Sequence, residues 1–322
     1  MLSKFSYRRV TSVNAAVAAA GRPGARILAG GTDLVGCLRD RVFTADTLVS
    51  LNGIKALKGI SPRPGGGLRI GVLTTLSEVV ANRQVSDSYP VLAQAAAAAA
   101  SPQLRNQGTI GGNICQRPRC WYFRGDFHCL RKGGDTCFAV LGENQFHCIL
   151  GGGPCFIVHP SDTAPALLAL DANLRVTGTG GPRTVPLSKF FVLPAQNIRK
   201  ENILEPGDVV TDILLPAVKP GLRSSYRKVR GRGAWDFALA GVALALTMSG
   251  KRVEQARVVF SGVAPIPWRS EPAERAITGK ELNATSVAQA AQEAVKDADP
   301  LTHNEYKVSL VRGVLTEALL AV

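Results

Sequence analysis

The sequence predicts an α+β protein built in three parts, with a candidate boundary near residue 220. Three observations lead to this prediction. Short apolar strands alternate with helices before residue 110, the stretch 115–155 loses all periodicity, and two long apolar strands precede amphipathic helices beyond residue 221. A chain of 322 residues that is 46% hydrophobic and 19% charged can bury a core of this size.

The first part is predicted to alternate strands and helices. Its elements are a helix over 11–20, a strand, glycine pair and helix over 25–40, the same alternation over 47–53 and 67–80, and a buried alanine helix over 90–100. Thr11 or Ser12 would cap the first helix and Gly21 would end it. Pro90 would open the alanine helix, because proline is tolerated in a first helical turn.

The second half of the chain is predicted to return to regular structure. Its elements are a helix then a strand over 159–178, a strand over 208–216, two long antiparallel strands over 226–250 and 252–264, and helices near 271–278, 284–297 and 304–321. The two long strands would be joined at Ser249–Gly250. No internal repeat is visible.

Charge and hydropathy restrict the function. The formal net charge is +14, and most of it lies in residues 105–132 and 219–233. Neither run interleaves aromatic residues in a stacking pattern, so we expect an anionic cofactor or an acidic partner subunit rather than nucleic acid. There is no uninterrupted apolar run of about 18 residues and no apolar signal core at the start, so neither a transmembrane helix nor a secretory signal is expected.

Two short glycine motifs suggest a phosphate site. They are LAGGTDL, residues 28–34, and TIGGN, residues 109–113. Glycine lets backbone N–H groups approach a phosphate, and a helix after Gly31 would add its positive end. Asp33 is expected to cap that helix. Neither motif is G-x-G-x-x-G or a Walker loop, and each alone fits an ordinary strand-to-helix turn. The pair favours a nucleotide cofactor whose diphosphate lies between them.

The cysteines suggest a metal site. Six of the seven lie between 115 and 155, and an odd count without a signal argues against a disulfide framework. Cys120, Cys129, Cys137 and Cys155 have the spacing C-x8-C-x7-C-x17-C, which lacks the close pairs of common zinc and ferredoxin motifs. Four thiolates can hold a [4Fe-4S] cube or a zinc ion, and unrelated buried thiols are a third possibility. His128 and His147 each precede a cysteine, and we expect both to be solvated bystanders.

Together these motifs resemble a known family. AGGTDL, TIGGN, HPSD and YRKVRGRGAWDFALAGVALAL, in this order, are similar to the FAD-binding medium subunit of the molybdenum hydroxylases, the xanthine dehydrogenase, carbon monoxide dehydrogenase and aldehyde oxidoreductase family. The resemblance spans essentially the whole chain. NICQRPRCWYFRGDFHC, GGDTC and GGGPCFIVHPSD most resemble the bacterial periplasmic aldehyde oxidoreductase type, whose insertion binds [4Fe-4S]. The 4-hydroxybenzoyl-CoA reductase also has such an insertion.

The resemblance implies a two-subdomain FAD-binding fold of the vanillyl-alcohol-oxidase (PCMH) type over residues 1–220, with a Cys-rich insertion at about 115–155, and a CO-dehydrogenase-flavoprotein-like domain over 221–322. The FAD-binding residues it implies are Arg26, Ile27, Leu28, Ala29, Gly30, Gly31, Thr32, Asp33, Leu34, Thr109, Gly111, Gly112, Asn113, Ser161, Asp162 and Lys228. The glycine loops would hold the pyrophosphate, and Ser161 and Asp162 the ribityl or pyrophosphate region. Lys228 would lie near the flavin, where a cation stabilises the reduced anionic form; a solvated strand lysine is the alternative.

The resemblance also assigns the cluster. Cys120, Cys129, Cys137 and Cys155 match the four [4Fe-4S] ligands. Cys115 and Cys148 remain possible replacements, above all Cys148 for Cys155. Cys37 is expected to serve packing only.

The implied function is electron transfer. A large partner subunit would oxidise the substrate at a molybdenum cofactor, a small subunit with two [2Fe-2S] clusters would deliver electrons to FAD on this chain, and an external acceptor would receive them. No catalytic acid, base or nucleophile is expected here, and no membrane partner. The basic runs would dock the other subunits or offset the FAD phosphates. The compartment would be the cytoplasm, or the periplasm by co-export with a partner.

Two other functions remain open from the sequence. One is a zinc-stabilised interaction scaffold without flavin. The other is an independent flavin oxidase of the same fold, which would need its own substrate pocket and base.

Overall fold

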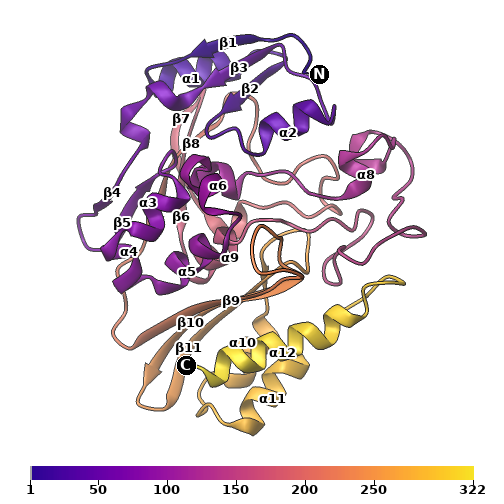
Figure 1. The fold of residues 1–322 in the computed structure, drawn as a ribbon. Coiled ribbons are helices and arrows are strands. Elements are labelled where there is room, and N and C mark those ends of the chain that lie inside the picture. Colours follow the sequence, from indigo (N-terminus) through magenta and orange to yellow (C-terminus); the bar gives the residue numbers. More distant parts are fainter. Residues whose placement is uncertain (1) are drawn as a thin grey trace.

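The computed structural model describes residues 2–322 and confirms the predicted α+β class (Figure 1). The first sheet is parallel, in the order β1-β3-β2, and consists of β1 (Ser6–Arg9), β2 (Ala25–Leu28) and β3 (Thr47–Ser50). Its helices are α1 (Val13–Ala20) and α2 (Leu34–Arg39). Ser12 caps α1 by accepting the N–H of Ala15 at 3.2 Å, as predicted.

One predicted helix in this part is wrong. Two 3-10 turns, η1 (Leu51–Gly53) and η2 (Lys55–Leu57), follow β3 where the sequence predicts strand and then helix. Asn52 and Gly53 are poor helix formers, so the chain makes only single turns there.

The second sheet is antiparallel, in the order β4-β5-β8-β6-β7. Its strands are β4 (Ile60–Pro62), β5 (Leu68–Gly71), β6 (Asn173–Gly178), β7 (Gly181–Pro186) and β8 (Val209–Leu215). The helices of this part are α3 (Leu76–Ala81), α4 (Arg83–Ser88), α5 (Pro90–Ala98), α6 (Pro102–Gln107), α7 (Ile110–Ile114) and α9 (Thr163–Ala169), with η4 (Leu187–Lys189). The alanine helix α5 buries one face only, because Gln94 and Ala97 are exposed.

The third sheet is antiparallel, in the order β12-β11-β10-β9. Its strands are β9 (Leu222–Val229), β10 (Ala240–Ser249), β11 (Arg252–Ser261) and β12 (Trp268–Arg269), and α10 (Glu271–Ile277), α11 (Ala284–Glu293) and α12 (Tyr306–Leu320) complete the C-terminal part. The predicted strand 226–250 is wrong as one element. It is two strands that pair with each other, because the glycine-containing stretch 230–239 leaves the sheet. The turn at Ser249–Gly250 is confirmed.

The position of β10 between two cores explains why its sequence is almost continuously apolar. Successive side chains of a strand point to opposite faces. Ala243 and Ala245 belong to the core of the first two sheets, whereas Val242, Leu244 and Leu246 belong to the core beneath the C-terminal helices. Both faces of β10 are therefore buried, and the C-terminal part packs against the rest of the molecule through this strand.

The cysteine segment, residues 115–155, lies to one side of the molecule, between α2 and the start of α12 (Figure 1). Its regular structure is limited to α8 (Trp121–Arg124) and the 3-10 turn η3 (Leu130–Lys132). Ile149 and Leu150, near its end, join the C-terminal core. Within residues 2–322, no helix is long and apolar enough to cross a membrane.

His159 lies where the C-terminal part meets the rest of the molecule. Its backbone N–H donates to the carbonyl of Ala264 at 2.9 Å, and its ring packs edge-on against Phe191. Nδ1 accepts the backbone N–H of Ser161 at 3.4 Å. Burial disfavours the imidazolium and lowers the pKa of His159 to about 4.

This burial predicts a pH-dependent stability. Between about pH 6.5 and pH 4 the unfolded chain binds a proton at His159 that the folded chain does not, so the stability present above pH 6.5 is lost as the pH falls. Across this whole pH interval the free energy of unfolding falls by about 3 kcal/mol. We expect His159→Gln to reduce this dependence of the free energy of unfolding on pH, as measured by urea denaturation at each pH. His303→Gln, at an exposed histidine, should leave the dependence unchanged. Parallel profiles for wild type and His159→Gln would contradict the prediction.

Candidate functional site

The first glycine loop contacts the residues directly before the second. The side-chain amide of Gln107 donates to the carbonyl of Gly30 at 3.1 Å. A Cβ on Gly30 would lie 2.1 Å from the carbonyl oxygen of Gln107, so only glycine permits this approach. The next residue, Gly31, has a φ of 76°, which also favours glycine. The chain therefore brings residues 28–34 and 109–113 together at one place.

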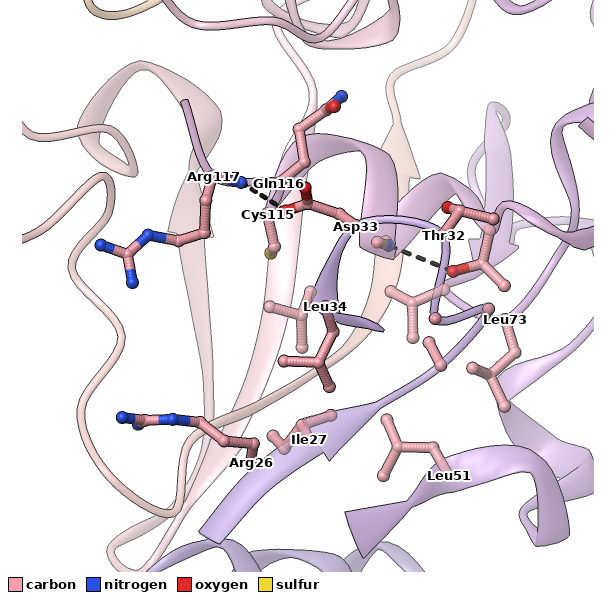
Figure 2. A pocket seen from close by; sticks show the side chains of 18 of the residues that line it. Arg26, Ile27, Thr32, Asp33, Leu34, Leu51, Leu73, Cys115, Gln116 and Arg117 are labelled. Carbon is pink, nitrogen blue, oxygen red and sulfur yellow. Dashed lines mark hydrogen bonds between the residues drawn. The ribbon is translucent and has the colours of Figure 1, made fainter. Parts of the chain in front are cut away.

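A cavity of about 280 Å³ opens where these loops meet, and we call it the first cavity (Figure 2). The predicted FAD residues that line it are Arg26, Ile27, Ala29, Gly30, Gly31, Thr32, Asp33, Leu34, Thr109, Gly111 and Gly112. Sequence reasoning missed another part of the wall, which includes Cys115, Gln116, Arg117 and residues 208–210. Only the position of 115–117, directly after TIGGN, signals part of that wall.

Two arginines give the first cavity a positive side. The guanidinium carbons of Arg26 and Arg117 lie 4.9 and 5.6 Å from the ring centroid of Phe43. Burial and then the neighbouring Arg117 lower the pKa of Arg26. Both effects disfavour the cation as it stands, so an anion bound between the two arginines would be stabilised.

Asn113 ties the second glycine loop to α9. Its Oδ1 accepts the hydroxyls of Ser161 and Thr163, each at 2.6 Å. Ser161 Oγ in turn accepts the N–H of Ala164 at 2.9 Å. Asn113 and Ser161 are thus committed to each other and to the start of the helix.

Asp162 and Lys228 form a buried ion pair across the junction with β9. Lys228 Nζ lies 2.8 Å from Asp162 Oδ2, and the two side chains are 4% and 7% exposed. The hydroxyl of Tyr226 donates to Asp162 Oδ1 at 2.7 Å. Burial raises the pKa of Asp162, and Lys228 opposes this shift. The solvated-lysine alternative for Lys228 is therefore wrong.

A second cavity, of about 290 Å³, is lined in part by Asp162 of this pair. The residues of interest that line it are Ser161, Asp162, Cys120, Trp121, His147 and Phe237. The predicted FAD residues thus divide between two cavities, and Leu28, Asn113 and Lys228 line neither. Leu28 instead packs against the small apolar cluster around Leu48.

The four predicted cluster ligands share one narrow cavity, which we call the cysteine cavity. Its lining includes Cys120, Cys129, Cys137, Cys155 and the cation Arg131. Backbone N–H groups are directed at the sulfurs, from Tyr122 and Phe123 to Cys120, from Ala139, Val140 and Phe156 to Cys137, and from Ile157 to Cys155. Hydrogen bonds from Cys155 and these amides lower the pKa of Cys137. Burial raises the pKa of Cys120 to about 11, and the hydrogen bond to Cys137 together with burial raises that of Cys155. The thiolate form is therefore favoured at Cys137.

Three cysteines lie outside the cysteine cavity. Cys115 and Cys37 line the first cavity, where burial raises their pKa values to about 12 and 11. Cys148 is fully buried, and burial raises its pKa far more. All seven cysteines are free thiols.

The two histidines that precede cysteines differ. His128 is exposed, as expected. His147 is 5% exposed and its Nε2 lies 3.3 Å from Cys120 Sγ, so the expectation of a solvated bystander is wrong for it. Burial, and then the nearby Lys307, lower the pKa of His147 to about 4. The sequence offered no signal for this contact, because 27 positions separate the two residues.

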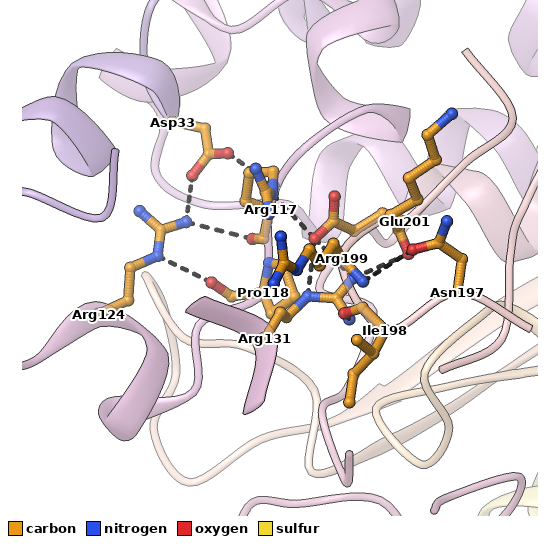
Figure 3. Close-up of polar contacts among 10 residues, drawn as sticks. Asp33, Arg117, Pro118, Arg124, Arg131, Asn197, Ile198, Arg199 and Glu201 are labelled. Atoms are coloured by element: carbon orange, nitrogen blue, oxygen red, sulfur yellow. Dashed lines mark hydrogen bonds and ion pairs between the residues drawn. The ribbon is translucent and has the colours of Figure 1, made fainter. Parts of the chain in front are cut away.

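Two acidic side chains hold the cysteine segment through its arginines (Figure 3). Asp33 Oδ1 binds Arg124 at 2.7 Å and Arg119 at 3.0 Å, and Asp33 Oδ2 accepts the backbone N–H of Arg117. The Asp33 side chain makes no capping bond to α2, so the predicted capping role is wrong. Its carboxylate is instead occupied by the cysteine segment.

Glu201 is the second of these carboxylates. Its Oε1 accepts from Arg117 at 2.8 Å and from Arg131 Nη2 at 2.7 Å. Arg131 is 1% exposed and also donates to the carbonyls of Ile198 and Lys200. The expectation that residues 105–132 form a docking surface is therefore wrong for these arginines, because their charges are used inside the molecule. Arg117 alone among them also lines the first cavity.

Comparison with known proteins identifies the family of the chain. Residues 3–218 match the FAD binding domain in molybdopterin dehydrogenase, and residues 224–322 match the CO dehydrogenase flavoprotein C-terminal domain. The chain is 35% identical to the aldehyde oxidoreductase FAD-binding subunit PaoB of Escherichia coli K12, over 99% of this chain and 98% of that one. It is 29% identical to the carbon monoxide dehydrogenase medium chain of Hydrogenophaga pseudoflava, over 98% and 96%.

A solved structure has the same fold. It is the carbon monoxide dehydrogenase from Hydrogenophaga pseudoflava that lacks the Mo-pyranopterin moiety of its cofactor. It matches with a TM-score of 0.80 and 28% identity, over 100% of this chain and 98% of that one.

The ionic support of the cysteine segment can be tested at Glu201. Glu201→Gln leaves Arg131 buried without a counter-charge, and we expect a loss of about 3–5 kcal/mol in the free energy of unfolding. Glu205→Gln is the matched control, because Glu205 is 65% exposed in its pair with Lys200 and should change stability by no more than about 0.5 kcal/mol. Chemical denaturation measures both. Equal effects of the two substitutions would contradict the prediction.

Proposed function

The chain belongs to the family of FAD-binding medium subunits of the molybdenum hydroxylases, and from this premise we propose that it transfers electrons through its FAD to an external acceptor. The observation that carries the proposal is the first cavity, in which both glycine loops and two arginines surround one space. Bound FAD takes up two electrons one at a time and passes them on.

The pyrophosphate of FAD fits the first cavity. Backbone N–H groups of the first glycine loop, together with the cations of Arg26 and Arg117, favour a diphosphate there. In the second loop the N–H groups of Gly111 and Gly112 already donate to the Val72 carbonyl at 3.0 Å and to Thr109 Oγ1 at 3.1 Å. The first loop and the arginines are therefore the principal donors, and the Thr109 hydroxyl keeps its own proton to donate.

The isoalloxazine end of FAD is assigned to the second cavity. Ser161 and Asp162 line it, and Trp121 and Phe237 add flat apolar faces. Lys228 does not line this cavity, and it acts through its bond to Asp162 Oδ2, whose negative charge it offsets. Without Lys228 the Asp162 carboxylate would oppose the reduced, anionic flavin.

The partners follow from the relatives. Those relatives are medium chains or FAD-binding subunits of aldehyde and carbon monoxide oxidoreductases. We therefore assign substrate oxidation to a molybdenum cofactor on a large partner subunit and electron delivery to [2Fe-2S] clusters on a small one. The residues that line the two cavities then serve to bind and orient FAD, without an acid, base or nucleophile of their own for the organic substrate.

We assign a [4Fe-4S] cluster to Cys120, Cys129, Cys137 and Cys155. The support is that these four thiols, and neither Cys115 nor Cys148, line the cysteine cavity. Thiolates are the soft ligands that iron–sulfur clusters require, and backbone N–H groups directed at the sulfurs stabilise their negative charge. Arg131, buried beside them, supplies a positive charge.

The zinc-scaffold alternative receives no support from the geometry. A zinc ion requires ligand sulfurs about 3.8 Å apart, as follows from Zn–S bonds of about 2.3 Å in a tetrahedron. Among residues 2–322, no group of three or more His, Cys, Asp or Glu side chains is arranged to hold one ion. A cube separates its four thiolates further, because each one binds a different iron.

FAD binding can be tested at the contact between the glycine loops. In Gly30→Ala the new Cβ would collide with the carbonyl of Gln107, so we expect FAD binding to weaken about tenfold or more. Gly180→Ala is the matched control, because nothing lies within 4 Å of a Cβ there. Flavin content of the purified complex, after incubation with excess FAD, measures the effect. Full flavin content in Gly30→Ala would contradict the assignment.

The cluster can be tested by metal analysis of the anaerobically purified complex. We expect about four irons and four sulfides on this chain, in addition to those of a small subunit. Single serine substitutions of Cys120, Cys129, Cys137 or Cys155 should each lower this iron content, whereas Cys148→Ser and Cys115→Ser should retain it. Zinc without sulfide, or iron lost only with Cys148→Ser, would overturn the ligand assignment.

A further inference from the structure

Cys120 lies in the wall between the cysteine cavity and the second cavity. Cys120 lines the cysteine cavity together with Cys129, Cys137 and Cys155. It lines the second cavity together with Ser161 and Asp162. Its neighbour Trp121 also lines the second cavity. A change in the charge on the Cys120 sulfur is therefore felt on both sides of this wall.

His147 is the side chain that contacts this sulfur. Its Nε2 lies 3.3 Å from Cys120 Sγ, within the range of a hydrogen bond to sulfur. It is 5% exposed and also lines the second cavity. Water therefore has little access to this side chain and cannot easily replace it as a hydrogen-bond partner.

The backbone around His147 is held from the C-terminal part. Four consecutive carbonyls accept hydrogen bonds from three side chains at the start of α12. The Tyr306 hydroxyl donates to Gln145, Lys307 Nζ donates to Phe146, and Asn304 Nδ2 donates to both His147 and Cys148, all at 2.9–3.1 Å. Lys307 is itself fully buried and also donates to the carbonyl of Gly262 at 2.8 Å. The position of the His147 ring is thus fixed by the cysteine segment and by the C-terminal part together.

We propose that His147 is a positioning residue, which donates a hydrogen bond from Nε2 to Cys120 Sγ and thereby raises the reduction potential of the cluster. This inference rests on the cluster assigned above. A thiolate bound to iron carries no proton, so the hydrogen of the 3.3 Å contact comes from the ring. A donor to sulfur stabilises the extra negative charge of the reduced cluster, and such bonds are among the factors that set iron–sulfur potentials.

Removal of the His147 donor is expected to lower the reduction potential of the cluster. Removal of the His147 donor leaves the two backbone N–H groups at Cys120 but withdraws one side-chain bond, so the cluster becomes harder to reduce. One hydrogen bond corresponds to about a tenfold change in the ratio of reduced to oxidised cluster, or about 59 mV for one electron.

The experiment uses the purified complex and three variants. His147→Leu removes the donor, His147→Gln keeps an N–H donor, and His128→Leu is the matched control, because His128 also precedes a ligand cysteine but is exposed. Redox titration, followed by the low-temperature electron paramagnetic resonance signal of the reduced [4Fe-4S] cluster, gives the potential. Iron, sulfide and flavin contents are measured on the same samples.

We expect a more negative potential in His147→Leu, with wild-type potentials in His147→Gln and His128→Leu. An unchanged potential in His147→Leu overturns the proposal, and so does loss of iron from both His147 variants. Loss of iron from His147→Leu alone, with His147→Gln normal, supports it. Absence of the four irons and four sulfides from the wild type would remove the proposed cluster as well, whereas an unchanged potential removes only the role of His147.

Discussion

Two carboxylates, Asp33 and Glu201, hold the cysteine segment in place, and both candidate cofactor sites depend on them. Glu201 Oε1 binds Arg117, which lines the first cavity, and Arg131, which lines the cysteine cavity. Asp33 belongs to the first glycine loop and binds Arg119 and Arg124 of the segment. A buried arginine without such a partner would be strongly destabilising, so the segment is stable only where these carboxylates meet it.

This arrangement changes the meaning of the high positive charge. A basic run in a sequence usually suggests an external anion, but the arginines of the cysteine segment are largely neutralised within the fold. The positive charge that lines the first cavity comes from Arg117, which is shared with Glu201, and from Arg26, whose pKa is lowered by burial and then by Arg117. The first cavity is therefore electrostatically prepared for an anion although most of the surrounding arginines are paired.

The sequence predicted those features that depend on neighbouring residues. The cap of α1 at Ser12, the glycine turn at Gly31, the turn at Ser249–Gly250 and the predicted helices other than the one after β3 arise from local chemistry. The features it missed join distant positions. Asp33 and Arg124 are 91 positions apart, and Arg131 and Glu201 are 70 apart. A helix-start aspartate looks like a cap in any sequence, and only the folded chain shows that its carboxylate is directed to the cysteine segment.

The contacts of the cysteine segment indicate whether the proposed cluster is structural or takes part in electron transfer. A structural metal site adds most stability where a segment has few other contacts to hold it. The cysteine segment already has two buried ionic contacts to the first glycine loop and residue 201, and four carbonyls bound by residues at the start of α12. Its four thiols nevertheless meet beside the second cavity, with Cys120 in the shared wall. Since electron transfer weakens with distance while structural support does not require closeness to the flavin, this position favours a redox role.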